Sequence, residues 1–349
     1  MSTNQIPIEN IYYLLCYAWD KLDEADIVSV DKLDNKNILE LLSRVLISGM
    51  GALIRRGLDR EYVEINEESR SIRGKIDFNT TIKKNLLQNA QIACTYDDLS
   101  HNVLHNQIIK STIRTLIRCN DIDKTLASKL AVIYRKLVGI DEIRVTRKVF
   151  KNVRLNRNNY YYDFLLKICE LINDKLIITD NEGNTKFRDF LRDERAMNRL
   201  FESFVRNFYK KELKGKYLVS RKNIPWNAIP LDKKSGNFLP NMQTDIFLES
   251  LVGDDRLIID TKYYKEALQT YYDKKTIHSN NLYQIFAYLK NLEATGAENK
   301  DCRGMLLYPT TSKELSLSFD VGGHEVTVKT INLDQNWKEI DKSLREILN

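Results

Sequence analysis

The sequence predicts a mainly helical α+β N-terminal domain, followed by an α/β C-terminal domain in which helices flank a mixed sheet. Its 349 residues suggest two domains at roughly 150 residues each. Of five prolines, only Pro7 precedes Pro225, and a proline-free stretch of that length favours helices joined by short connections. The C-terminal half alternates helix and strand patterns in an order typical of α/β domains. We place the domains at residues 1–165 and 166–349.

Composition and the absence of targeting signals narrow the class of protein. Hydrophobic residues make up 43% and charged residues 29%, a balance that excludes disordered and fibrous chains. The first ten residues lack a basic region followed by an apolar run, and no segment approaches about 18 consecutive apolar residues. The five scattered cysteines form no C-x-x-C pair, which favours reduced thiols. We therefore expect a cytoplasmic protein with no membrane span.

In the N-terminal half, apolar residues recur mostly at helical spacing. Residues 62–78 instead alternate apolar and polar side chains, which predicts a hairpin near Gly74. Residues 144–150 are compatible with a strand, and the Asn- and Arg-rich run 151–159 with a loop. The predicted helices are residues 8–19, 37–56, 102–117, 126–137 and 160–176.

The C-terminal half has a different order of elements. Two apolar strands follow a long basic helix and a proline-containing loop, and a further helix, a buried strand, a hairpin and a final helix complete the domain. In chain order these are residues 192–213, 242–248, 257–264, 281–292, 304–308, the turn at Gly322–Gly323, and a helix from about residue 336.

Charge is unevenly distributed along the chain. The formal net charge is only +6, but residues 101–160 carry thirteen basic and four acidic side chains, and residues 186–222 carry twelve and five. Residues 1–50 carry four basic and eight acidic side chains. Two basic stretches after an acidic start make nucleic acid a partner to test.

Acidic side chains on the two apolar strands are the strongest chemical signal. Asp245 lies in the first strand, and Asp260 and Lys262 lie two residues apart, hence on one face, in the second. A carboxylate on an apolar strand costs several kcal/mol of desolvation unless a cation compensates it. Oxygen ligands suit Mg²⁺, or Mn²⁺, and a neighbouring lysine can orient water or neutralise a phosphate. This set predicts metal-assisted phosphodiester hydrolysis. The alternative is a surface ion pair, because D-x-K triplets are common by chance.

Two further features extend this set. Gln284 and Tyr288 lie on one face of the following helix, as Q-x-x-x-Y. Glu202, in the basic helix, could supply a third carboxylate for the metal, or could pair with Arg206 one turn later. The order of these residues resembles the PD-(D/E)xK nucleases, particularly their RecB-like branch, although no proline directly precedes Asp245.

Longer motifs resemble the McrC family, the nuclease subunits of the McrBC 5-methylcytosine-specific restriction systems, over nearly the whole chain. They are IPIENIYYLLCYAWD at 6–20, IRGKIDF at 72–78, NQIIKSTIRTLI at 106–117, LPNMQTDI at 239–246, IIDTKYY at 258–264 and HSNNLYQIFAYL at 278–289.

The resemblance implies a division of labour. The C-terminal domain would cut double-stranded DNA, and the N-terminal domain would dock on McrB, a GTP-driven AAA+ ring that recognises methylated cytosine, and would stimulate its GTP hydrolysis. Asp245 and Asp260 would be metal ligands and Lys262 the catalytic lysine. Gln284 and Tyr288 would orient DNA or the lysine, while Glu202 carries over only weakly.

No G-x-x-x-x-G-K-[ST] loop occurs in the sequence, because neither Gly74–Lys75 nor Gly215–Lys216 is followed by Ser or Thr. We therefore expect this chain to bind no nucleotide itself. The run 151–159 could be the tip of an arm that reaches into the ring. Arg154 or Arg157 would then act on the partner's nucleotide site. The alternative is a solvated loop.

Three functions remain open from the sequence. The chain could be the nuclease subunit of a restriction complex, a stand-alone RecB-like nuclease in repair, or a catalytically silent activator of the motor. The complete set of Asp245, Asp260 and Lys262 disfavours the silent activator. The long N-terminal half without a motor disfavours the stand-alone nuclease.

Overall fold

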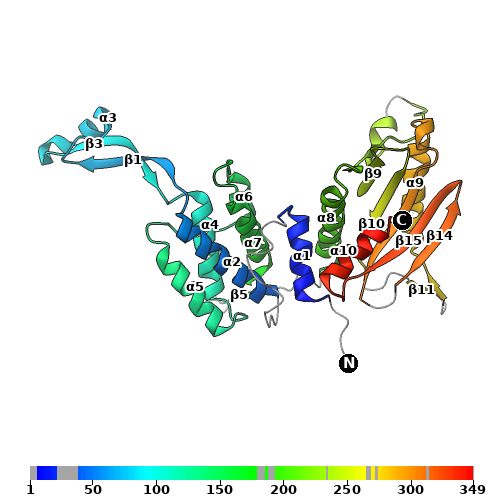
Figure 1. Cartoon of the computed structure of the whole chain (residues 1–349). Coiled ribbons are helices and arrows are strands. Elements are labelled where there is room, and N and C mark those ends of the chain that lie inside the picture. The colour runs from blue at the N-terminus through cyan, green and yellow to red at the C-terminus, as the bar shows by residue number, and fades with distance from the viewer. Residues whose placement is uncertain are drawn as a thin grey trace. The chain divides into compact units, whose positions relative to one another are not determined.

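The computed structural model describes residues 6–21, 38–178, 185–187, 193–232, 235–264, 269–271, 274–311 and 314–348. The chain forms two compact units (Figure 1). One, here the sheet unit, combines Met1–Leu33 with Asp189–Asn349, and the other, here the arm unit, is Asp34–Arg188. The division differs from the predicted boundary after residue 165. That boundary would cut helix α7 (Tyr162–Lys175), which buries its apolar face within the arm unit.

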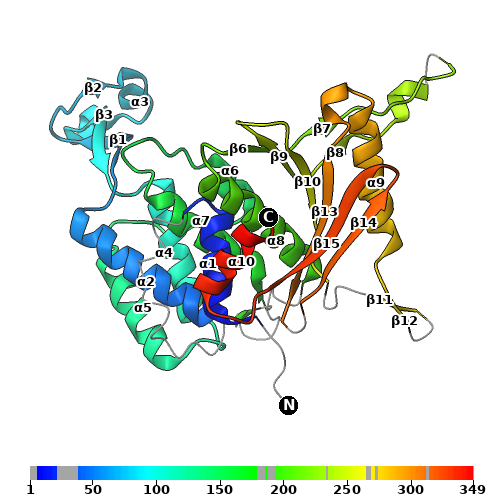
Figure 2. The same cartoon turned by 45° about the vertical axis from the view of Figure 1, so that its right-hand side comes forward.

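The sheet unit is built on a six-stranded mixed sheet, as the sequence predicts. The strand order is β14-β15-β13-β10-β9-β6, with β10 parallel to β13, β13 parallel to β15, and antiparallel pairs at both edges (Figure 2). The strands are β6 (Tyr217–Ser220), β9 (Ile246–Ser250), β10 (Arg256–Thr261), β13 (Arg303–Thr310), β14 (Ser316–Val321) and β15 (His324–Asn332). Short paired strands are β7 (Asn223–Ile224) with β8 (Met242–Gln243), and β11 (Gln269–Tyr271) with β12 (Lys274–Thr276).

Helices pack on this sheet through apolar side chains. A glycine in β13, Gly304, allows α9 (Ser279–Glu293) to approach closely, because a Cβ there would lie 2.9 Å from side-chain atoms of Ile285 and Leu289. The remaining helices of the unit are α1 (Ile8–Ala18), α8 (Glu194–Glu212) and α10 (Trp337–Glu346). All four helices were expected from the apolar spacing of the sequence.

The first helix of the chain belongs to the sheet unit. The ring of Tyr17 lies 5.8 Å from that of Phe204 in α8, and Asn207 of α8 donates hydrogen bonds to the carbonyls of Tyr17 and Ala18. The ring of Tyr13 stacks on Trp337 of α10. The sheet unit is therefore assembled from both ends of the chain.

The arm unit contains a group of helices with a small sheet projecting from it (Figure 1, blue to green). Four of its helices bury predominantly apolar residues, among them Leu42, Ile109 and Leu130. They are α2 (Ile38–Arg56), α4 (Leu104–Ile117), α5 (Lys124–Lys136) and α7, whereas the short α6 (Arg147–Asn152) has no buried residue. Beside them is the two-stranded pair β4 (Leu176–Ile178) and β5 (Thr185–Phe187).

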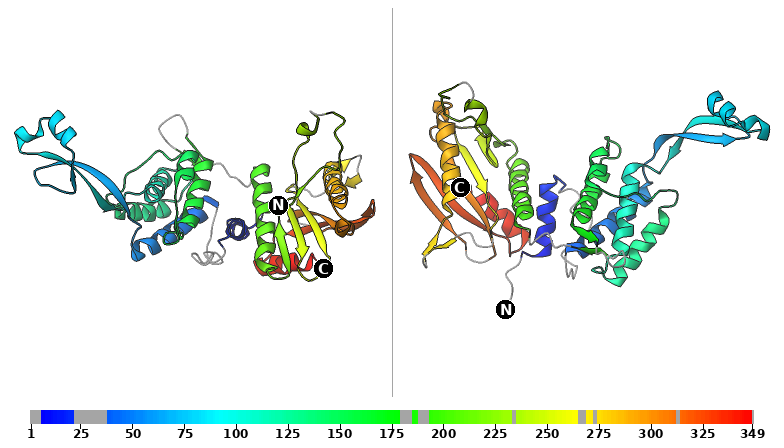
Figure 3. Two further views of the ribbon diagram at one scale, coloured as in Figure 1. Left: turned by 90° about the horizontal axis from the view of Figure 1, so that it is seen from above. Right: turned by 180° about the vertical axis from the view of Figure 1, so that it is seen from behind.

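The projecting sheet, here the arm and drawn in blue and cyan in Figure 3, has the order β1-β3-β2. Strand β1 (Glu61–Ser69) pairs along its whole length with β3 (Ile92–Ser100), and β2 (Lys75–Ile76) pairs with the other edge of β3. The predicted hairpin at 62–78 is therefore wrong, because the partner of β1 lies further along the chain. Helix α3 (Phe78–Lys83) and a 3₁₀ turn (Leu86–Asn89) fill the connection.

The strand expected at 144–150 is also wrong, because α6 begins at Arg147. The β-branched residues favour a strand locally, but no partner strand pairs with this segment among the described residues, and Arg147 makes an exposed ion pair of 2.9 Å with Asp174 of α7. The five cysteines are buried thiols that form no disulfide, in agreement with the sequence. No helix in the described part of the chain is long and apolar enough to span a membrane.

Candidate active site

The two predicted metal ligands lie close to each other at the sheet, Asp260 in β10 and Asp245 directly before the neighbouring strand β9. The single strand expected at 242–248 is interrupted, so that Asp245 sits between β8 and β9. One carboxylate oxygen of Asp245, Oδ2, accepts hydrogen bonds from the backbone N–H of Thr261 (3.0 Å) and from its hydroxyl (3.2 Å). The interruption thus turns the Asp245 side chain toward the end of β10.

Asp260 is the most buried charged group of this site. It lies in β10, fully shielded from solvent, and Nζ of Lys262 lies 2.7 Å from its Oδ2. Neither carboxylate oxygen has a hydrogen-bond partner among the described residues, so the ion-pair contact with Lys262 is the interaction that compensates it. Oδ1 is left buried without a partner. A buried acceptor in this state fits a site that binds a cation.

The protonation of the pair follows from burial. The pKa of Asp260 is raised to about 7. Burial and the nearby Asp245 raise this pKa, and together they outweigh Lys262, which lowers it. Burial lowers the pKa of Lys262, but the carboxylates of Asp260 and Asp245 outweigh this and leave it above its ordinary value. Near pH 7, Lys262 is therefore a cation, while Asp260 is partly protonated.

Gln284 and Tyr288 reach the same region from α9. Gln284 donates a hydrogen bond of 2.7 Å to the hydroxyl of Tyr288, which in turn donates one of 3.0 Å to the carbonyl of Gln243. Gln243 ends β8, two residues before Asp245. The pair therefore holds the backbone that presents Asp245.

Glu202 has basic partners. It is largely buried on α8 and accepts hydrogen bonds from Arg206 (2.8 Å) and from Arg221. Glu202, Asp245 and Asp260 are all described, yet they do not come within 4.8 Å of one another as a ligand set. The pairing with Arg206 anticipated from the sequence is present, and a metal-binding role for Glu202 stays a prediction.

Two positioning residues were not identified from the sequence. Thr261 holds Asp245, and Asn198 of α8 accepts a hydrogen bond of 2.9 Å from the backbone N–H of Tyr263, directly after Lys262. Both contacts use a backbone donor at the end of β10. No pattern of residue types encodes such contacts, because every residue except proline carries this donor.

The predicted arginines Arg154 and Arg157 are exposed in the loop between α6 and α7. This loop does not belong to the projecting sheet that is here named the arm, and its expected contact with a partner stays a prediction. Asn159 is buried and donates a hydrogen bond of 2.7 Å to Asp59, immediately before β1. The loop therefore lies against the base of the arm, and the projecting part is β1, β3 and α3 (Figure 1).

Comparison with known proteins identifies the family. The model of the McrBC 5-methylcytosine restriction system component matches residues 9–309. An Escherichia coli (strain K12) protein, "Type IV methyl-directed restriction enzyme EcoKMcrBC", is 34% identical over 347 residues, covering 99% of this chain and 98% of that protein. A chain in the half-complex from the tetradecameric assembly of Thermococcus gammatolerans McrB AAA+ hexamers with bound McrC has a TM-score of 0.63 at 18% identity. That match covers 98% of this chain and 75% of the other and supports the fold. The chain thus belongs to the McrBC 5-methylcytosine restriction system component family.

Proposed function

We propose that this chain is the nuclease subunit of a modification-dependent restriction complex and hydrolyses phosphodiester bonds in methylcytosine-containing double-stranded DNA. The observation that carries the proposal is the fully buried Asp260, whose unpartnered oxygen lies beside Lys262 and near Asp245. A structural ion pair would not need a second carboxylate, held by Thr261, close to the first. The E. coli relative is described as a restriction enzyme, in agreement with this chemistry.

The site has the composition of a PD-(D/E)xK nuclease. Asp245 and Asp260 would hold a Mg²⁺ ion, or Mn²⁺, because both offer hard oxygen ligands. Such an ion lowers the pKa of bound water and neutralises charge on the phosphate. Lys262, held protonated by the two carboxylates, is suited to stabilise the developing negative charge rather than to accept a proton.

DNA would approach over the basic helix α8. Arg195 and Arg199 are exposed and flank Asn198, which binds the backbone next to Lys262. Exposed arginines beside the site can contact the phosphate backbone of DNA without recognising its base sequence. Recognition of the methylated base would then belong to the partner.

The partner would be a McrB-like AAA+ GTPase hexamer that docks on the arm unit. The archaeal relative is described as bound to McrB AAA+ hexamers, and we extend that partner to this chain. The arm supports the extension, because four large apolar side chains on it are 65–67% exposed, namely Ile72, Phe78, Ile82 and Leu87. Several large apolar side chains exposed on one small element are typical of protein interfaces.

Arg154 and Arg157 would stimulate the partner's GTPase, directly or through a partner residue. An arginine supplied in trans stabilises charge on a transferring phosphate. Arg154→Ala and Arg157→Ala should therefore lower GTP hydrolysis by the partner while the complex still forms. Unchanged stimulation in an intact complex would remove this part of the proposal.

A cleavage assay tests the nuclease itself. Methylated DNA is incubated with Mg²⁺, with and without the McrB-like partner and GTP, using the native chain and Asp260→Asn. We expect cutting only with partner and GTP, and at least a ~100-fold loss in the variant, because metal-assisted charge stabilisation is worth several kcal/mol. Asp254→Asn, on the exposed turn before β10, is the matched control.

The same assay separates the alternatives. Cutting by the native chain alone would favour a stand-alone nuclease. Stimulated GTPase without any cutting would favour a silent activator. Normal cutting by Asp260→Asn would reject the proposed site.

A further inference from the structure

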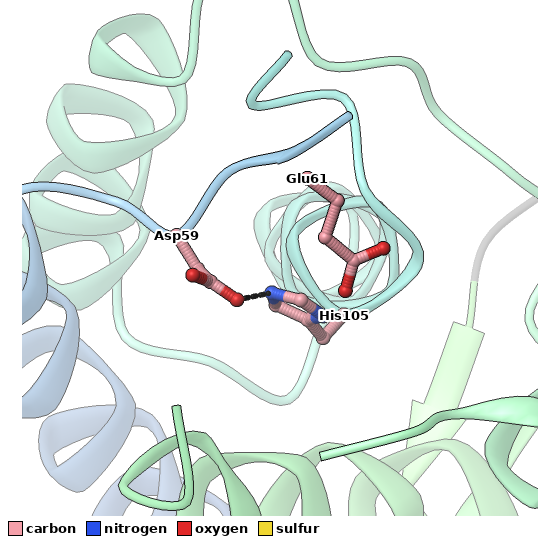
Figure 4. Close-up of side chains that lie close together, drawn as sticks. All are labelled: Asp59, Glu61 and His105. Atoms are coloured by element: carbon pink, nitrogen blue, oxygen red, sulfur yellow. Dashed lines mark ion pairs between the residues drawn. The ribbon is translucent and has the colours of Figure 1, made fainter. Parts of the chain in front are cut away.

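A second group of metal-ligating side chains lies in the arm unit, where the arm joins the helices. It consists of Asp59, Glu61 and His105 (Figure 4). One ligand atom from each lies within 4.8 Å of the others, and no other described set of three or more such residues is this close. We propose that these residues bind a divalent metal ion, Zn²⁺ or Mn²⁺. The bound ion would hold the arm to the helices.

The three residues come from the two ends of the arm. Asp59 precedes β1, Glu61 is the first residue of β1, and His105 is in the first turn of α4, directly after β3. Glu61 pairs with Ser100, the last residue of β3. An ion bound here would therefore cross-link the point where the chain leaves the helices with the point where it returns.

The imidazole of His105 is the strongest sign of a ligand. His105 is only 2% exposed, and its Nε2 has no hydrogen-bond partner among the described residues, although Oδ2 of Asp59 lies 3.0 Å away. The two atoms are in contact without hydrogen-bond direction. Two ligands of one metal lie at a similar separation, and an unprotonated Nε2 offers the lone pair that a metal ion binds.

Asp59 is held rigidly from three elements. Its side chain accepts a hydrogen bond of 2.7 Å from Asn159, its backbone N–H donates to the hydroxyl of Tyr162 (3.0 Å), and its carbonyl accepts from Asn106 (3.1 Å). The ring of Tyr162 also packs edge-on against His105, with centroids 4.6 Å apart. In metal sites, neighbouring residues typically orient the ligands through hydrogen bonds of this kind.

The donor set selects the class of ion. One imidazole nitrogen with two carboxylate oxygens suits Zn²⁺ or Mn²⁺ better than Mg²⁺, which favours oxygen ligands and water. Burial lowers the pKa of His105 more than Asp59 and Glu61 raise it, so the imidazole is neutral near pH 7, as metal binding requires. Glu61 is exposed, which leaves a side open for water.

The test measures metal binding to the full chain. All variants carry Asp260→Asn, which removes a ligand of the proposed nuclease site, so that failure of one site does not affect the other. The metal-free protein is titrated with ZnCl₂ and MnCl₂ by calorimetry, and bound metal is counted after dialysis. We expect one ion per chain and a higher midpoint of thermal unfolding with metal than without it.

Three variants decide the outcome. Glu61→Gln removes an exposed ligand without disturbing a described hydrogen bond and should weaken binding at least ~10-fold. Glu64→Gln, exposed on the same strand, should leave it unchanged. His105→Asn should abolish it. Equal affinity in Glu61→Gln and Glu64→Gln, or no bound ion in the parent, would show that His105 and Asp59 form an ion pair only and would overturn the proposal.

Discussion

Strand β10 of the sheet unit buries all but its first residue, whereas no residue of β1 in the arm unit is buried. The two strands carry comparable acidic side chains in opposite environments. In β10, burial makes the charge of Asp260 costly and shifts its pKa toward neutrality. In β1, solvent hydrates the acidic groups, so their charges carry little desolvation cost. The strand extends along the arm. Burial thus shifts the protonation of an acidic group in the sheet unit, whereas the acidic groups of β1 stay hydrated in the arm unit.

The largest effect expected from this difference is on the pH dependence of cleavage. Without a bound metal the pKa of Asp260 is raised to about 7, so below pH 7 protons compete with the metal for the carboxylate. At a subsaturating Mg²⁺ concentration, the cleavage rate in the full complex should therefore fall about 50-fold between pH 7 and pH 5. Partner GTP hydrolysis, measured in parallel, controls for assembly. A flat profile between pH 5 and 7 would mean that the burial of Asp260 does not govern the reaction.

The exposed side of the comparison is tested on the arm. The double substitution Phe78→Ser and Ile82→Ser should weaken binding to the McrB-like partner about 30-fold, the ~2 kcal/mol typical of a buried interface anchor. Stability should change by less than about 0.5 kcal/mol, because both side chains already face solvent. Val138→Ser, 81% exposed but outside the arm, is the control. If the native chain, the double variant and Val138→Ser bind the partner with equal affinity, the exposed apolar residues of the arm do not form the binding surface.

A smaller effect is expected at Thr261. Thr261→Val removes the hydroxyl contact with Asp245 but keeps the backbone N–H, so kcat should fall about fivefold, equivalent to one hydrogen bond of ~1 kcal/mol. KM should not change, because Thr261 is buried away from DNA. Thr327→Val, at a buried threonine of the same sheet, should leave kcat unaltered. A change confined to KM would contradict the positioning role.

The smallest effect concerns Tyr288. Tyr288→Phe removes the hydrogen bonds to Gln243 and from Gln284, and should lower the free energy of unfolding by ~1 kcal/mol. Thermal or urea unfolding measures this. Tyr283→Phe on the same helix, at a tyrosine that is 69% exposed, should be neutral. If both variants unfold alike, the tyrosine hydroxyl does not fasten β8.

The sequence was sufficient where local periodicity decides the structure. The apolar spacing of α2, α4, α8 and α9 identified each helix to within a few residues. It was insufficient where distant segments pair. Strand β1 alternates correctly, but its partner β3 begins 23 residues after β1 ends, and a nearer strand was the simpler expectation. The six residues of α6 were misassigned because local propensity is a weak guide to secondary structure in a segment this short.

The candidate site shows the same limit. Spacing on an apolar strand was enough to select Asp245, Asp260 and Lys262, because a buried charge is costly and therefore conspicuous. The convergence of Asp59 with His105 was not visible, since 46 residues separate them along the chain. The sequence also predicted only one of the two arginine partners of Glu202. The second, Arg221, lies after the end of α8, the helix that carries Glu202.

The position of α1 against α8 has a consequence for synthesis of the chain. Because translation proceeds from the N-terminus, α1 leaves the ribosome before the whole arm unit and about 190 residues before the end of the helix that covers it. At about 5–20 residues per second, its apolar face waits roughly 10–40 seconds for its partner. The arm unit, which is continuous in sequence, can complete its core within that time. Co-translational folding should therefore run from the middle of the protein outward, with α1 among the last elements to dock.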